Sequence, residues 1–150
     1  MEPSRKEAPE QLALALFEQG FTCGQAVIAA FAEGHGLDRD AALRVGCAFG
    51  GGVARTGATC GAVNGALVVL GLAHGRTRIE DVESRERTYD AARTFLARFR
   101  EAYGSDVCRE LLGVDIGTPE GRETASKAGL FKTRCPALVG GAARIVATLV

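Results

Sequence analysis

Apolar residues recur along this chain at three- and four-residue steps, the spacing that places them on one face of a helix. Leu12 and Leu16 follow Pro9 at this spacing, and Phe99 and Tyr103 close a much longer periodic segment. No stretch shows the strict alternation that is typical of a strand, so the predicted fold is all-α. We expect helices over residues 9–20, 23–33, 39–48, 60–74, 79–103, 108–112, 119–128 and 135–150, with a loop over 127–134.

The segment over residues 60–74 differs from the other expected helices because it is apolar on every side. Between Ala62 and Ala73 the one polar side chain is that of Asn64. A helix of this kind is surrounded by other helices, and the missing side chains of Gly61 and Gly65 allow them to come close. We therefore predict a single-domain bundle of about six to eight helices around this segment, with Thr59 as its N-cap and residues 1–8 as a frayed lead-in.

Composition supports a folded globular domain and excludes several classes of protein. Hydrophobic residues make up 47% of the 150 residues and charged residues 24%, and the formal net charge is zero. A balanced charge argues against nucleic acid or an anionic membrane as the partner. The longest apolar run is shorter than the ~20 residues of a membrane span, and the N-terminus lacks the apolar core of a signal peptide. We expect a cytoplasmic protein.

Five cysteines then need an explanation, because stable disulfides are rare in the cytoplasm. No two of them form a C-x-x-C pair, which excludes a zinc ribbon and a thioredoxin-type motif. Four of them stand at or just before the expected first turn of a helix, where free amides and the helix dipole stabilise a thiolate. These four are Cys23, Cys60, Cys108 and Cys135. Cys47 lies near the end of its expected helix and is interpreted as a core residue.

The ordered cysteine motifs resemble the C-GCAxxG-C-C family, whose members are described as redox-active. Cys23 opens the string TCGQAV, and Cys60, Gly61, Ala62 and Gly65 form the CGAxxG element after a triple glycine. CRELLG at Cys108 and CPALV at Cys135 complete the likeness over residues 21–145. The resemblance implies that these four cysteines are the family's functional set. It also implies redox activity or an iron–sulfur centre, and genes that often lie near transporter genes.

Two kinds of chemistry fit four thiolates that meet at one end of a bundle. Four sulfurs can hold an iron–sulfur cluster or another thiolate-bound metal. Without a metal, two thiol pairs can cycle between dithiol and disulfide. In either case an unknown redox partner is implied, and the hypothesis is that the four cysteines form one site while Cys47 stays outside it.

Three further residues are candidates for contact with a cofactor. Gly61 leaves room beside Cys60, and Arg55 lies in the glycine-rich loop, which can cradle an anion. Asn64 carries an amide that needs partners if buried.

Two alternatives to a redox or metal protein stay open at this point. One is a non-catalytic accessory or binding protein, for example transporter-associated, with structural cysteines. The other is an enzyme with a single nucleophilic cysteine, for which the sequence offers no general base.

Overall fold

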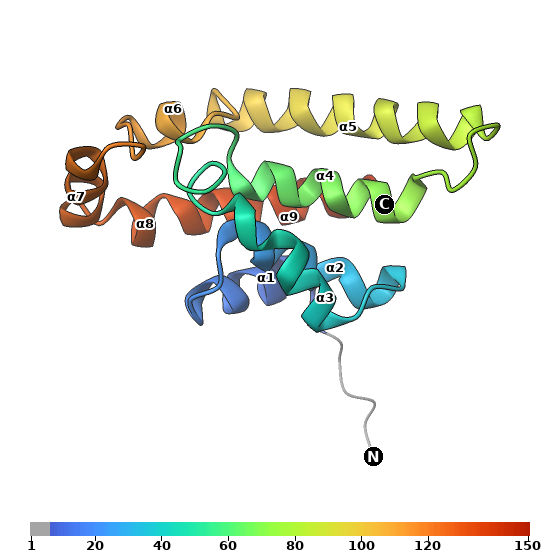
Figure 1. Ribbon diagram of the computed structural model, residues 1–150, viewed down its shortest axis with the longest axis horizontal. Coiled ribbons are helices and arrows are strands. Elements are labelled where there is room, and N and C mark those ends of the chain that lie inside the picture. The colour runs from blue at the N-terminus through green and yellow to red at the C-terminus, as the bar shows by residue number, and fades with distance from the viewer. Residues whose placement is uncertain (1–6) are drawn as a thin grey trace, which may run out of the picture.

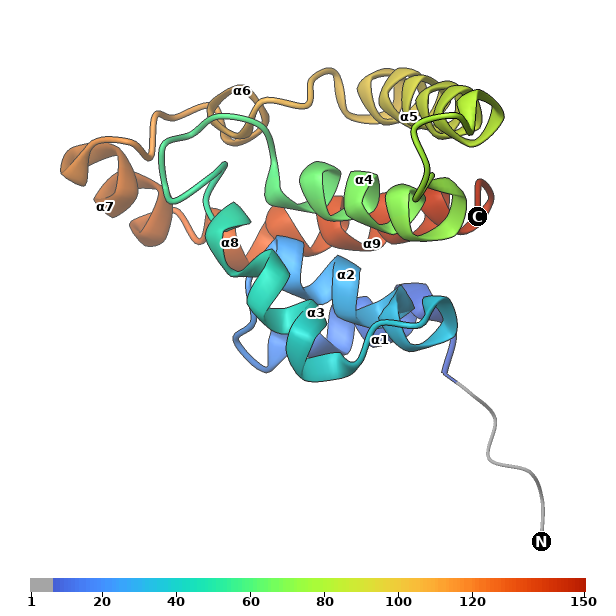
Figure 2. The same cartoon turned by 45° about the vertical axis from the view of Figure 1, so that its right-hand side comes forward.

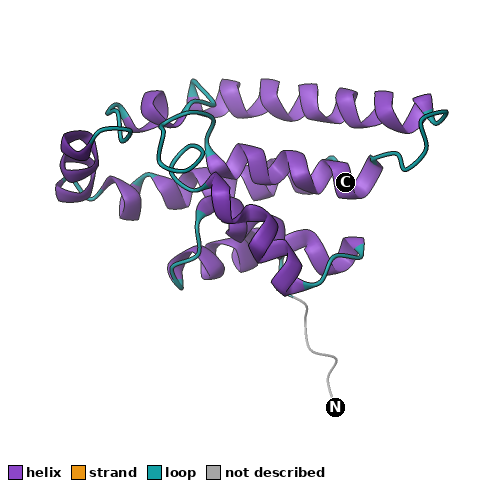
Figure 3. Cartoon of the chain, viewed as in Figure 1, coloured by secondary structure: helices purple, strands orange, loops and turns teal. Residues whose placement is uncertain are grey.

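The computed structural model describes residues 7–150, and every regular element in that range is helical (Figure 1, Figure 3). Two short 3-10 helices, Glu33–His35 and Cys47–Phe49, follow α2 and α3. The α-helices are α1 (Pro9–Glu18), α2 (Cys23–Ala32), α3 (Arg39–Gly46), α4 (Gly61–His74), α5 (Val82–Tyr103), α6 (Cys108–Leu112), α7 (Pro119–Lys127), α8 (Leu130–Thr133) and α9 (Cys135–Ala147). The prediction of an all-α fold is confirmed, and the prediction that residues 1–8 are frayed falls mostly outside the described residues.

Helix starts follow from local sequence at most positions. Thr22 and Gln25 cap α2 reciprocally, and the Asp38 carboxylate accepts from the Ala41 amide at 2.9 Å. The expected N-cap of α4 is wrong, since the helix begins one residue later with Cys60 at the N-cap. Thr59 is held in an extended bridge with Val107, so the chain turns helical only after it.

The helices pack in three tiers in the views of Figures 1 and 2, with α5 above the pair α4 and α9, and α1–α3 below. Fully buried side chains come from each tier, among them Ile28 of α2, Leu70 of α4 and Phe95 of α5. Seven of the ten residues of α2 are buried, against seven of the fourteen in α4. The central position predicted for α4 is therefore shared with α2. Within residues 7–150, no helix has the length and apolarity needed to cross a bilayer.

Glycines set the distance between α2 and α4, which make the most extensive contact of any helix pair. A Cβ atom added to Gly65 would lie 3.0 Å from the Gly24 carbonyl oxygen. One added to Gly24 would lie 2.7 Å from the Phe49 Cβ and 3.2 Å from the Gly61 carbonyl oxygen. The two backbones therefore touch, which explains the small residues in the CGAxxG element.

A second, smaller apolar cluster lies at the end of the molecule where α6, α7 and α8 gather (Figure 1). Ile116 and Ala125 are its most buried members, and Phe131 packs against it. The expected loop over residues 127–134 contains one helical turn, α8, after Gly129 has reversed the chain with a φ of +70°. A four-residue turn is too short to give a periodic pattern, which is why the sequence did not reveal it.

Candidate thiol site

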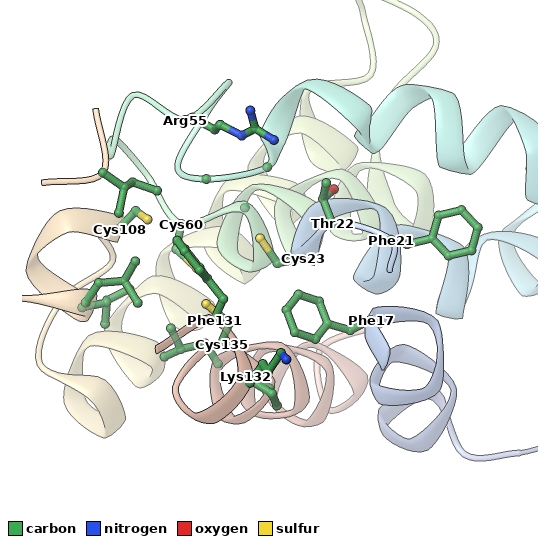
Figure 4. Close-up of a pocket in the computed structure, with 18 of the residues that line it drawn as sticks. Phe17, Phe21, Thr22, Cys23, Arg55, Cys60, Cys108, Phe131, Lys132 and Cys135 are labelled. Atoms are coloured by element: carbon green, nitrogen blue, oxygen red, sulfur yellow. The ribbon is translucent and has the colours of Figure 1, made fainter. Parts of the chain in front are cut away.

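All five cysteines border one cavity of about 1190 Å³, near the beginnings of α2, α4, α6 and α9 (Figure 4). Cys23, Cys108 and Cys135 are each the first residue of their helix, and Cys60 is the N-cap of α4. The prediction that four cysteines stand at helix starts is therefore confirmed. Cys60 and Cys108 are buried, Cys23 and Cys135 are partly buried, and all are free thiols.

Backbone pairing fixes the start of α4 beside the start of α6. Thr59 and Val107 form an isolated antiparallel bridge. On either side of it, the Cys108 amide donates to the Ala58 carbonyl at 2.6 Å and the Cys60 amide donates to the Asp106 carbonyl at 2.8 Å. The loop before α4 is thereby fixed to the start of α6, although 48 positions separate the two cysteines in sequence.

Cys23 and Cys60 form a hydrogen-bonded thiol pair. The bond from Cys60 lowers the pKa of Cys23 to about 7, and the amides of Gly24 and Gly51 also favour the Cys23 thiolate. The same bond, together with burial and the nearby charge of Cys23, raises the pKa of Cys60 well above the usual range of a thiol. Cys60 is therefore the proton donor and Cys23 the thiolate of the pair.

Gly61 makes this contact sterically possible. A Cβ atom at that position would lie 2.5 Å from the Cys23 Sγ and 2.5 Å from the Phe49 carbonyl oxygen. Any other residue would push the Cys23 sulfur away from the start of α4. The glycine after Cys60 is thus explained by the thiol pair, whereas the glycine four residues later is explained by helix packing.

Cys108 and Cys135 lie on the side of the cavity formed by the smaller apolar cluster. Cys108 is a member of the smaller apolar cluster, and Cys135 packs against it. Burial, with a smaller contribution from the charge of Cys23, raises the pKa of Cys108 to about 11. Burial and the charges of Cys23 and Cys108 raise the pKa of Cys135 to about 12. Near neutral pH both are neutral thiols.

The expectation that all four thiolates converge on one centre is not met. Across residues 7–150, no three Cys, His, Asp or Glu side chains are grouped as the ligands of a metal ion would be. The physical reason is that Cys108 and Cys135 pack with the smaller apolar cluster, while Cys23 and Cys60 pack with the main core. As arranged here, the donor set does not fit a four-thiolate metal or iron–sulfur centre.

Two of the three residues proposed to contact a cofactor line the cavity, and the third does not. Gly61 and Arg55 line the cavity. Asn64 does not, since its side-chain amide donates to the Thr59 carbonyl at 3.4 Å and supports the start of its own helix. Cys47 is exposed at the edge of the cavity, in contrast to the core position expected for it.

A left-handed turn lies beside Cys23, and the sequence analysis did not predict it. Five consecutive residues, Gly51 to Arg55, have φ between +51° and +66°, and three of them are not glycine. Left-handed backbone costs a non-glycine residue about 1–2 kcal/mol. The turn closes with bonds such as that from the Ala54 amide to the Ala48 carbonyl at 2.8 Å, and it points the Gly51 amide at Cys23. Strain of this kind is commonly found at functional sites.

The glycines of this turn also allow contact with the second thiol region. A Cβ atom on Gly52 would lie 2.5 Å from the Cys108 Cβ. The turn therefore contacts cysteines of both regions, Cys23 through an amide and Cys108 through close packing.

Comparison with known proteins identifies one protein family. No curated protein and no solved structure matches the chain. Residues 21–149 match the protein family described as "Putative redox-active protein (C_GCAxxG_C_C)". That match contains every cysteine discussed above and covers most of the chain, so this protein belongs to the C_GCAxxG_C_C family.

Proposed function

We propose that this protein is a thiol–disulfide redox protein in which Cys23 is the attacking thiolate and Cys60 the second thiol. The observation that carries the proposal is the position of the Cys23 sulfur against Gly61, directly after Cys60, at the cavity that both cysteines line. The opposite pKa shifts of the two thiols agree with this position. This chemistry requires a thiolate present near neutral pH, and a neighbouring thiol that attacks the same sulfur in the mixed disulfide and releases the substrate thiol.

The surroundings of the pair support this division of roles. Cys23 is partly exposed at the cavity, whereas Cys60 is buried beneath it. An incoming disulfide therefore meets Cys23 first. Cys60 keeps its proton until Cys23 is bound covalently, because removal of the Cys23 negative charge also removes one cause of the high pKa of Cys60.

Cys108 and Cys135 have a different part in the proposal. Their raised pKa values keep them protonated while Cys23 reacts, so they are not competing nucleophiles. They form a second pair of thiols at the same cavity, and reduction of a Cys23–Cys60 disulfide falls to an external thiol partner.

A thiolate-bound metal or iron–sulfur centre is the alternative, and the family resemblance is its main support. One observation favours it, namely that the four family cysteines border one cavity. Their separation into two regions argues against it. Protein purified without oxygen distinguishes the two, because a cluster absorbs in the visible range and binds all four thiolates. We expect a colourless protein with titratable thiols.

Disulfide mapping tests the proposal directly. The Cys47→Ser protein is oxidised with one equivalent of diamide, digested without reduction and analysed by mass spectrometry. We expect one dominant disulfide, Cys23–Cys60, and no such product in Cys60→Ser, whose helical content should remain unchanged. A dominant Cys108–Cys135 disulfide, or no disulfide at all, would contradict the assignment and favour an accessory protein with structural cysteines.

A further inference from the structure

The cavity beside Cys23 is much larger than a reaction between two protein thiols requires. Its volume of about 1190 Å³ slightly exceeds the ~300–1,000 Å³ of pockets that bind small organic ligands, so a molecule of that size has room in it. Apolar side chains form much of its wall, including Phe17, Phe131 and Leu138. An occupant with an aromatic or aliphatic body would therefore be removed from water on binding.

The charged side chains at this cavity are mostly positive. Arg55, Arg122 and Lys132 line it, against the single carboxylate of Glu18. In Figure 4, Arg55 and Lys132 lie on opposite sides of the cysteines. Neither forms an ion pair with another residue in the range 7–150. Arg122 is held in place by its bond to the Ile116 carbonyl at 3.3 Å.

We propose that the substrate of the thiol pair is a small organic disulfide with an apolar body and carboxylate or other anionic groups. This inference rests on the proposed function and adds its substrate class. The apolar wall holds the body, and the three cations attract the negative groups. The protein as a whole has no net charge, so the preference for anions belongs to this cavity rather than to the surface in general.

The reaction is a two-electron reduction of the substrate. The Cys23 thiolate attacks one sulfur of R–S–S–R, the substrate S–S bond breaks, and one R–S⁻ leaves. Cys60 then attacks the Cys23 sulfur, and its proton passes to the second leaving group as R–SH. The protein retains a Cys23–Cys60 disulfide, and an external thiol or dithiol restores the reduced pair.

The test compares three disulfides with the reduced full-length protein that carries Cys47→Ser, which removes the exposed thiol. The probes are dithiobis(nitrobenzoate) as dianion, dipyridyl disulfide as neutral aromatic and cystamine as dication. The rate constant of the protein with each probe is divided by that of N-acetylcysteine thiolate with the same probe at the same pH. This removes the differences in intrinsic reactivity among the probes. We expect the dianion to be preferred over the dication, and the preference to shrink as salt is raised.

Substitution of two of the cations tests whether the cavity causes the preference for the dianionic probe. Arg55→Gln and Lys132→Gln should each lower the dianion rate about two- to five-fold, the usual size of exposed charge interactions, and leave the neutral probe unchanged. Lys127→Gln is the matched control, because Lys127 pairs with Glu123 and does not line the cavity. Its rates should not change.

Two distinct failures can be told apart. If Cys23→Ser still reduces the neutral probe at the original rate, the proposed function is wrong. If Cys23 is essential but the dianion has no advantage, or Lys127→Gln lowers its rate as much as Lys132→Gln, the anionic substrate class is wrong and the proposed thiol pair stands.

Discussion

In the helical core, α2 and α4 touch through glycines, and core side chains of the two helices, such as Ile28, Val63 and Leu70, are 0% exposed. At the thiol end, a left-handed turn and three short helices surround a large cavity with partly exposed cysteines. The first region has regular backbone and buried side chains, and the second has strained backbone and accessible sulfur. The close packing of α2 and α4 therefore supports the strained turn and the cysteines at the starts of these helices.

The largest expected effect comes from breaking the core. Leu70→Asp places an unpaired carboxylate where the side chain is 0% exposed, which should destabilise the fold by several kcal/mol and abolish cooperative unfolding. Ile79→Asp is the control, because Ile79 is 82% exposed. Its midpoint of thermal unfolding, measured by circular dichroism, should stay within a few degrees of the parent. A cooperative, soluble Leu70→Asp protein would show that α4 is not central.

A change at the junction between the two regions should affect both stability and reactivity. Gly61→Ala introduces a Cβ atom that would overlap the Cys23 sulfur and the Phe49 carbonyl. Overpacking of this kind costs about 1–3 kcal/mol, and the Cys23 thiol should react more slowly with iodoacetamide because it loses contact with Cys60.

Gly71 provides the matched control within the same helix. A Cβ atom there meets no other atom within 4 Å. Gly71→Ala should therefore stabilise the protein by about 0.5–1 kcal/mol through helix propensity and leave the Cys23 rate unchanged. A Gly61→Ala protein that is as stable as Gly71→Ala, with an unchanged Cys23 rate, would show that the thiol contact does not require a glycine at position 61.

The left-handed turn should be the place where stability can be gained. Val53 has a φ of +65° and is 37% exposed, so it has strained backbone and modest packing. Val53→Gly should raise the free energy of unfolding by about 1 kcal/mol, measured by urea denaturation. Val45→Gly, on the exposed side of α3, should lower it by about 0.5 kcal/mol. Destabilisation by Val53→Gly would show that the turn is not strained.

The smallest expected effect concerns the fifth cysteine. Cys47 is exposed and lies outside the hydrogen-bonded pair. Cys47→Ser should change neither the unfolding midpoint nor the pH dependence of Cys23 alkylation. A large change in either would place Cys47 in the site.

The fold could be predicted from the sequence because helical periodicity and caps are local signals. Pro9, Thr22 and Asp38 begin their helices as expected. The site was predicted less completely. The four helix starts were correct, but the choice of Cys23 over Cys60 as thiolate depends on a contact between α2 and α4. The left-handed turn has no sequence signal beyond its glycines, since Val53, Ala54 and Arg55 are residues that rarely adopt that backbone.

The pH dependence of alkylation, followed separately for each cysteine by mass spectrometry, tests the thiol pair most directly. Only the thiolate reacts, so the Cys23 rate should rise with pH and reach half its maximum near pH 7, the pKa set mainly by Cys60. In Cys60→Ala that midpoint should move upward, toward the ~8.5 of a free thiol, while Cys108 and Cys135 react only in stronger alkali. A Cys23 midpoint at or above 8.5 in the parent protein, or one unmoved by Cys60→Ala, would contradict the account.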